Sequence, residues 1–223
     1  MIELNEIFSD SDTRVAFWCA DVNDTNDLAI MAENIISENI HLISILPECV
    51  EQIWPYLEKS GVKILTRYTF NPIPKNIDSE IYNLAANISN VCRHGADGIQ
   101  IFVKMHDFDY LADSIAPVRD DLFFKHDLSI GIDISDIDMH NLEHFFEKLR
   151  YIRADSLVLT LNEDMGNRSD FVGRIYALLQ SWNLNGQLHF VSNNDYNRID
   201  QIIRLTEKIR PEMTENLRFF LNY

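Results

Sequence analysis

Short apolar runs rich in β-branched residues alternate along this chain with longer segments in which apolar residues recur at helical spacing. Eight of these runs have the length and composition of buried strands, and a segment of helical period follows each of the first seven. The predicted strands are 15–21, 41–46, 63–68, 98–104, 128–134, 156–161, 187–192 and 217–221. This order is typical of successive βα units with parallel strands.

The helix predicted after the second strand shows how the boundaries are found. Val50, Ile53 and Leu57 recur on one helical face. Pro47 stands in the first turn, where proline is tolerated, and Gly61 follows the last turn, where a left-handed residue commonly ends a helix. The pattern therefore predicts where the helix begins and where it ends.

Eight parallel strands with intervening helices close most simply into a (β/α)8 TIM barrel. An open, doubly wound sheet would give similar periodicity, but the number of strands favours the barrel. No linker or repeat interrupts the order, so we predict one domain over residues 1–223. No eighth helix precedes Tyr223. We therefore expect an apolar flank between strands eight and one, covered by the N-terminal segment or by another subunit of a homo-oligomer.

The charge of the chain argues against polyanionic partners. The formal net charge is -16, from 35 acidic and 19 basic residues, so we expect no binding of nucleic acid or of an anionic membrane. No apolar stretch approaches the roughly 20 residues that span a bilayer, and residues 1–10 are acidic, unlike a signal peptide. Three widely spaced cysteines indicate neither a disulfide framework nor a zinc site. We expect a cytoplasmic protein.

The segment 43–72, ISILPECVEQIWPYLEKSGVKILTRYTFNP, resembles the second and third βα units of the deoxyribose-phosphate aldolases. Two further segments resemble the openings of the family's fourth and sixth strands. The matching positions are Pro47, Val62, Lys63, Phe70, Pro72, the Gly-Ala-Asp at 95–97 and the Ala-Asp at 154–155. The order and spacing of these matches cover nearly the whole chain and imply the same barrel fold.

The resemblance also implies retro-aldol cleavage of a sugar phosphate through a lysine Schiff base, helped by a second lysine and an aspartate. At the matching positions, the Schiff-base lysine falls on Val158, the second lysine on Phe190 and the aspartate on Gln100. None of these three side chains can titrate. We therefore expect a divergent barrel that is inactive by this mechanism and is retained for binding a small anionic or sugar-phosphate-like ligand, or for association with another protein.

Active sites of barrels lie at the C-terminal ends of the strands, so polar residues there are the candidates for chemistry. They are Asp21, Glu48, Arg67, Tyr68, Lys104, His106, Asp107, Asp133, Asp136, Asn162, Glu163, Asn193 and Asn194. The carboxylates and His106 have the chemistry of metal ligands, but their spacing matches no dedicated metal motif. Only 7 Gly are present, so Gly-rich phosphate loops are scarce. We predict no metal and no cofactor.

Arg67, after the third strand, can hold a carboxylate or a phosphate in a bidentate manner. We predict that it belongs to a ligand-binding set at the mouth of the barrel. The other members are Asp21, Asn162, Glu163, Asn193 and Asn194. The asparagines replace the family's Gly-rich phosphate turn and can adopt its left-handed backbone. Alternatively, Arg67 neutralises acidic side chains around the mouth.

A second hypothesis is an active carbon–carbon lyase whose lysine has moved. Lys104 ends the apolar fourth strand, which is where transaldolase-like barrels carry their Schiff-base lysine, and Asp133 is its expected catalytic partner. Its side chain could point into the barrel, where its amine would be desolvated. Alternatively, Lys104 is a solvated residue at the end of the strand, paired with Asp107 or Asp133.

Overall fold

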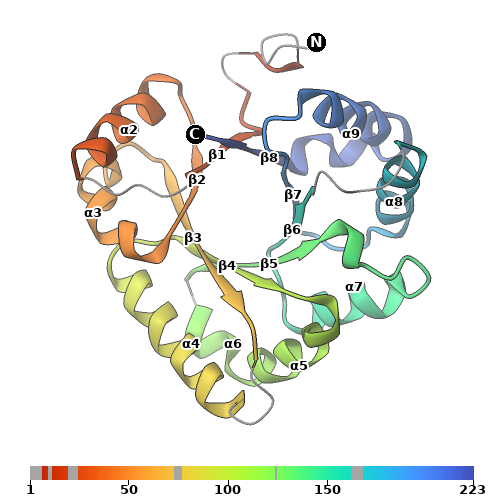
Figure 1. The fold of residues 1–223 in the computed structure, drawn as a ribbon, viewed down its shortest axis with the longest axis horizontal. Helices are drawn as coiled ribbons and strands as arrows, with labels where there is room; N and C mark the ends of the chain where they lie inside the picture. Colours follow the sequence, from red (N-terminus) through yellow and green to blue (C-terminus); the bar gives the residue numbers. More distant parts are fainter. Residues whose placement is uncertain (1–6, 10–11, 20–24, 73–76, 124, 162–167) are drawn as a thin grey trace.

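A computed structural model of the chain describes residues 7–9, 12–19, 25–72, 77–123, 125–161 and 168–223. The predicted site residues Asp21, Asn162 and Glu163 lie outside these ranges. All eight predicted strands are present, each parallel to the next, in one closed barrel of order β1 to β8 (Figure 1). The strands are β1 (Val15–Trp18), β2 (Leu42–Ile45), β3 (Lys63–Phe70), β4 (Gly98–Val103), β5 (Asp127–Asp133), β6 (Ser156–Thr160), β7 (Gln187–Val191) and β8 (Leu217–Asn222).

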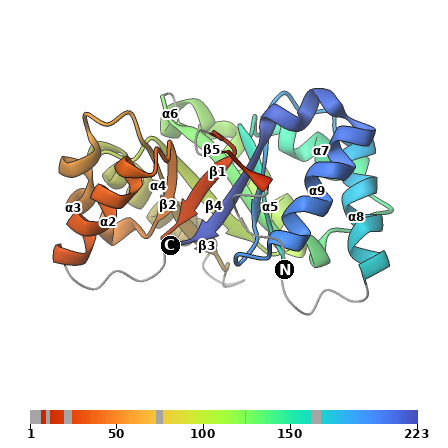
Figure 2. The same ribbon diagram turned by 90° about the horizontal axis from the view of Figure 1, so that it is seen from above.

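Pairing of β8 with β1, with Val15 opposite Phe219 and Trp18 opposite Asn222, closes the sheet and excludes the open alternative. Helices surround the barrel, and Figure 2 shows the strands crossing the space between two groups of them. The helices are α2 (Thr25–Ser37), α3 (Pro47–Leu57), α4 (Ile77–Arg93), α5 (Met105–Ile115), α6 (Arg119–Phe123), α7 (Leu142–Tyr151), α8 (Arg168–Ser181) and α9 (Tyr196–Ile209), with 3-10 turns η1 (Ala116–Val118), η2 (Ile134–Asp136) and η3 (Pro211–Asn216). No described helix combines the length and apolarity needed to cross a membrane.

Residues alternate between the two faces of each strand, as the pleat requires. Outward side chains such as Ile43, Ile130 and Phe190 join the core between sheet and helices. Inward side chains such as Leu65, Val158 and Phe220 form a separate cluster inside the lumen. The barrel therefore has two hydrophobic layers, and any site in the lumen is built from the inward positions alone.

The flank between β8 and β1 is partly covered by residues of the chain itself. The Phe8 ring lies 5.7 Å from that of Phe219 on the outer face of β8. The ring of Tyr223 lies 5.5 Å from that of Phe17 on β1, and its hydroxyl accepts a hydrogen bond of 2.7 Å from Asn34 on α2. Phe8 and Tyr223 thus cover part of the outer face of the sheet where β8 meets β1.

Candidate functional site

The middle of the lumen is closed by apolar side chains. Val158, the position matched to the Schiff-base lysine, is fully buried in a cluster with the inward residues of neighbouring strands. The other members are Ala16, Leu42, Leu65, Val191 and Phe220, with Trp18 and Phe102 packed against them. A lysine amine is therefore absent from this position, and the space around it is filled.

Three rings from this cluster, those of Trp18, Phe102 and Phe220, form what we call the aromatic plug. The Trp18 ring lies 5.6 Å from that of Phe102 and 5.9 Å from that of Phe220, both edge to face. Gly131 on β5 makes room for Phe102, since a Cβ there would lie 2.3 Å from the ring. Such edge-to-face contacts favour a fixed packing of the rings.

Arg67 lies on the C-terminal side of the plug and contacts the ends of two strands. Its Nη1 donates to the carbonyl oxygen of Ser44 at 2.9 Å, and its Nη2 donates to that of Cys19 at 2.6 Å. Its guanidinium carbon lies 4.2 Å above the Trp18 ring, within the range of a cation–π contact. Arg67 therefore ties β1, β2 and β3 together at the mouth.

Two further groups near this position have little capacity for chemistry. Burial raises the pKa of the Cys19 thiol to about 12, which keeps it protonated and unreactive. Gln100, at the position matched to the family's aspartate, is fully buried and accepts a hydrogen bond of 2.6 Å from Ser44 Oγ. Within the described residues its Nε2 has no hydrogen-bond partner.

The structure does not bring Lys104 and Asp133 together as an ion pair. Lys104 is exposed at the start of α5, where it forms no ion pair in the described part of the chain. The carboxylate of Asp133 accepts hydrogen bonds from the backbone nitrogen and hydroxyl of Ser135, at 2.8 and 2.6 Å, and so caps η2. The cavity beside Lys104 is lined by Met105, His106 and Asp136 instead.

The two asparagines after β7 both adopt left-handed backbone, with φ of 48° at Asn193 and 61° at Asn194. The side chain of Asn194 bridges the ends of β7 and β8. Its Oδ1 accepts from the backbone nitrogen of Asn222 at 2.8 Å, and its Nδ2 donates to the carbonyl oxygen of the same residue at 3.4 Å. The turn expected here therefore forms, and the amide of Asn194 is engaged within it.

The match of the second lysine to Phe190 is wrong, because the residues of β7 that face the lumen are the neighbours of Phe190. Phe190 points outward and stacks on Phe219 with ring centroids 5.6 Å apart. The inward residues of β7 are His189 and Val191. A slip of one residue moves a side chain to the opposite face of a strand, and neither inward residue is a lysine.

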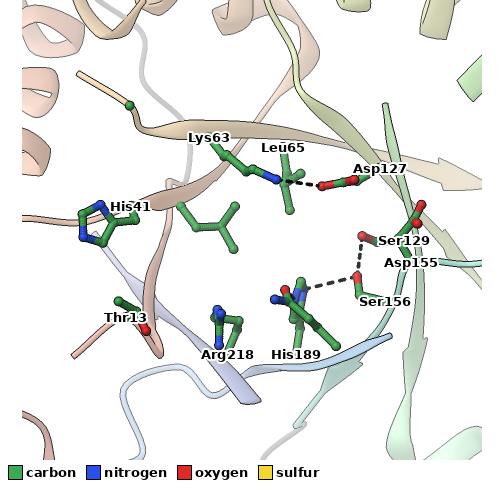
Figure 3. Close-up of a pocket in the computed structure, with 13 residues that line it drawn as sticks. Thr13, His41, Lys63, Leu65, Asp127, Ser129, Asp155, Ser156, His189 and Arg218 are labelled. Atoms are coloured by element: carbon green, nitrogen blue, oxygen red, sulfur yellow. Dashed lines mark hydrogen bonds and ion pairs between the residues drawn. The ribbon is translucent and has the colours of Figure 1, made fainter. Parts of the chain in front are cut away.

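A cavity of about 570 Å³ lies at the opposite end of the barrel, among the first residues of the strands. Figure 3 shows polar side chains converging on it from several strands. Its lining is Thr13, His41, Leu42, Gly61, Lys63, Leu65, Asp127, Ser129, Asp155, Ser156, Gln187, His189 and Arg218. We call it the N-terminal cavity. Its size is in the range of ordinary small-molecule sites, about 300–1,000 Å³.

A chain of hydrogen bonds runs along one wall of the N-terminal cavity (Figure 3). The hydroxyls of Ser129 and Ser156 lie 2.6 Å apart, and Ser156 Oγ lies 3.5 Å from His189 Nδ1. The other ring nitrogen of His189 lies 3.0 Å from Gln187 Oε1. Burial, helped by the charge of Arg218, lowers the pKa of His189 to about 3, so its imidazole is neutral at pH 7.

Sequence reasoning missed these residues because it considered only the C-terminal ends of the strands. A signal was present: Ser129, His189 and Arg218 are polar residues at inward positions inside otherwise apolar runs. Polar residues at lumen positions require partners or a ligand, since burial of an unpaired polar group is costly.

Comparison with known proteins shows which solved structures share this fold. No protein-family model matches the sequence, and no curated protein sequence matches it. Among solved structures, a protein described as a deoxyribose-phosphate aldolase from Coccidioides immitis has a TM-score of 0.70 at 10% identity, over 96% of this chain and 81% of that one. The deoxyribose-phosphate aldolase from Aeropyrum pernix has a TM-score of 0.68 at 11% identity, over 99% and 90%.

The chain has the fold of the deoxyribose-phosphate aldolases. A protein described as the copper homeostasis protein CutC from Streptococcus agalactiae is also similar, with a TM-score of 0.64 at 11% identity over 93% of this chain and 97% of that one. At such low identity the likeness concerns the fold, and function has to be argued from the site itself.

Proposed function

We propose that this barrel binds a small anionic ligand and does not cleave carbon–carbon bonds through the Schiff-base mechanism of the aldolases it resembles. One observation carries the proposal: Val158, matched to the Schiff-base lysine, is sealed in the lumen beside the aromatic plug. Imine formation needs an amine in an open pocket that also admits the carbonyl substrate. Neither requirement is met at this position.

The mouth of the barrel is one candidate place for the ligand. The proposed contact residues there are Arg67, Asp21, Asn162, Glu163, Asn193 and Asn194, of which Asp21, Asn162 and Glu163 lie outside the described residues. Two nitrogens of Arg67 already donate to carbonyl oxygens, and the Asn194 amide bridges two turns. Because these hydrogen bonds use donors that an anion would need, the mouth is a weaker anion site. The N-terminal cavity is the second candidate.

Binding and chemistry are tested together with the purified protein. We expect inorganic phosphate, D-gluconate or 2-deoxyribose 5-phosphate to raise the melting temperature, because a ligand that binds only the folded state stabilises it. We expect no covalent adduct when borohydride is added with acetaldehyde or 2-deoxyribose 5-phosphate. Failure of every anion to bind in a thermal-shift and calorimetric panel would contradict the proposal.

The alternative function is an active lyase that uses Lys104. The observation in its favour is the cavity of about 490 Å³ that Lys104 shares with His106 and Asp136, which provides an amine beside groups able to transfer protons. A borohydride adduct that disappears in Lys104→Ala and persists in Lys125→Ala, a matched exposed lysine, would establish this alternative. That outcome would replace the binding proposal.

We also propose that the chain forms a homo-oligomer that uses the β8/β1 side. The Aeropyrum pernix aldolase is described as tetrameric. Tyr223 is 46% exposed beside this flank and accepts a hydrogen bond from Asn34 on α2. Ile30, one helical turn before Asn34, is 57% exposed. Sedimentation analysis is expected to show an oligomer that Ile30→Glu weakens and Tyr82→Glu, on distant α4, leaves intact. A concentration-independent monomer would contradict it.

A further inference from the structure

Several hydrogen-bond donors in the N-terminal cavity have no partner among the described residues. Arg218 on β8 shows this most clearly. Its Nη1 donates to the carbonyl oxygens of Leu217 and Glu215, at 2.6 and 2.8 Å. Its Nε and Nη2 form no hydrogen bond, and the side chain forms no ion pair, with any residue that the structure describes.

The free edge of Arg218 is the one that suits a carboxylate. Arg14, close by, uses its own Nε and Nη2 to hold the two carboxylate oxygens of Asp12, at 2.9 and 2.6 Å. Such side-on, bidentate pairs are among the strongest charge-assisted hydrogen bonds in proteins. The carboxylates of Asp12 and Glu215 act on Arg218 through space without bonding to it. Arg218 therefore lines the cavity with a bidentate donor pair unoccupied.

Gln187 adds two more donors. Its Oε1 can only accept, so the nearby Nε2 of neutral His189 must carry the ring proton. His189 Nδ1 then accepts from Ser156, which in turn accepts from Ser129. In this chain of hydrogen bonds, Gln187 uses only its Oε1, so both N–H bonds of its Nε2 have no partner among the described residues.

The acidic residues of the cavity are already compensated. Asp127 pairs with Lys63 at 3.4 Å, as Figure 3 shows. Asp155 accepts from Arg119 at 2.8 Å and from the backbone nitrogen of Leu128 at 2.7 Å. Arg218, unlike Lys63, has no ion-pair partner among the described residues. The two carboxylates add a repulsion that a doubly charged phosphate would feel more than a singly charged carboxylate.

We propose that the N-terminal cavity is the ligand site of this barrel and that it binds a small hydroxy-carboxylate, such as a sugar acid. The carboxylate lies on the Nε–Nη2 edge of Arg218, and a hydroxyl oxygen accepts from Gln187 Nε2. Leu42 and Leu65 provide an apolar wall for the carbon chain. This inference rests on the proposed function, since it names the location and the ligand class of the binding proposed above.

The test is isothermal titration with D-glycerate and D-gluconate, with glycerol as the uncharged control. We expect the acids to bind and glycerol not to bind. Arg218→Gln, which removes the charge, is expected to weaken binding at least about tenfold, as loss of a charge-assisted bond predicts. Arg204→Gln, an exposed arginine on α9 paired with Asp200, is the matched control and is expected to bind as the wild type does.

A second variant guards against misfolding of Arg218→Gln. Gln187→Glu has the same shape and can still accept from His189, but it replaces the donor that faces the ligand with a negative charge. We expect it to fold and to bind the acids at least about tenfold more weakly.

The outcomes separate this inference from the proposed function. Acids that bind equally well to the wild type, Arg218→Gln and Gln187→Glu would place the ligand elsewhere and overturn the inference alone. So would binding of phosphate but of neither acid, or equal binding of glycerol. If none of the anions binds, both the inference and the proposed function fall.

Discussion

At the scale of single residues, the motifs behind the aldolase resemblance have structural roles in this chain. Asp97, from the Gly-Ala-Asp that opens β4, accepts a hydrogen bond of 2.8 Å from the backbone nitrogen of Ile64 on β3. Asp155, from the Ala-Asp that opens β6, does the same for Leu128 on β5 at 2.7 Å. These carboxylates satisfy backbone donors where strands begin. These motifs are therefore evidence for the fold and not for a catalytic activity.

His189 gives the protein a specific dependence on acid. Its pKa is about 3 in the folded protein against 6.5 as its ordinary value, because it is buried. Between these pH values the unfolded chain binds more protons at this imidazole, so the free energy of unfolding falls as the pH falls. The slope for one such group is at most about 1.4 kcal/mol per pH unit.

Urea unfolding at a series of pH values checks this dependence. In His189→Gln, which cannot titrate there, the loss of stability between pH 6.5 and 3 is expected to be shallower than in the wild type. His140→Gln, at an exposed position, is expected to keep the wild-type slope. Identical slopes in all three proteins would show that His189 does not titrate in this window.

At the scale of elements, all eight strands were predicted from apolar runs, because buried parallel strands are nearly continuous in apolar residues. Predicted ends differ from observed ends by up to three residues, as at β1, which ends at Trp18 instead of residue 21. The resemblance matched the second lysine to Phe190 without considering which face of the strand this residue occupies. In the structure Phe190 points outward, and His189 occupies the lumen.

The connection from α4 to β4 depends on a glycine. Gly95 has φ of +109°, and a Cβ there would lie 1.9 Å from the indole of Trp54 on α3. Gly95→Ala is expected to lower the free energy of unfolding by about 1–3 kcal/mol, through backbone strain and displacement of the indole. The measurement is chemical unfolding followed by tryptophan fluorescence and circular dichroism.

A matched glycine serves as the control. Gly173 lies inside α8, and a Cβ there would meet nothing within 4 Å. Gly173→Ala is therefore expected to stabilise the protein by up to about 1 kcal/mol, because alanine is the better helix former. If both substitutions changed stability equally, the contact with Trp54 would not be the cause.

At the scale of the whole molecule, the sequence predicted the closed barrel. It did not predict the N-terminal cavity. Lys63, Ser129 and Arg218 are far apart along the chain and meet only because each stands at or near the start of a strand. Barrel sites are expected at the opposite end, at the C-terminal ends of the strands. In this barrel the aromatic plug closes the middle of the lumen, between that end and the N-terminal cavity.

The walls of the N-terminal cavity have a consequence for the lifetime of the protein. They come from β2, β3, β5, β6, β7 and β8, so one bound molecule would act as a removable cross-link between segments that are otherwise joined only through the barrel. At a concentration of about 100 times its dissociation constant, it would add about 2.7 kcal/mol to the free energy of unfolding. The abundance of this barrel in a cell would then follow the supply of its ligand, because proteases remove chains that unfold more often.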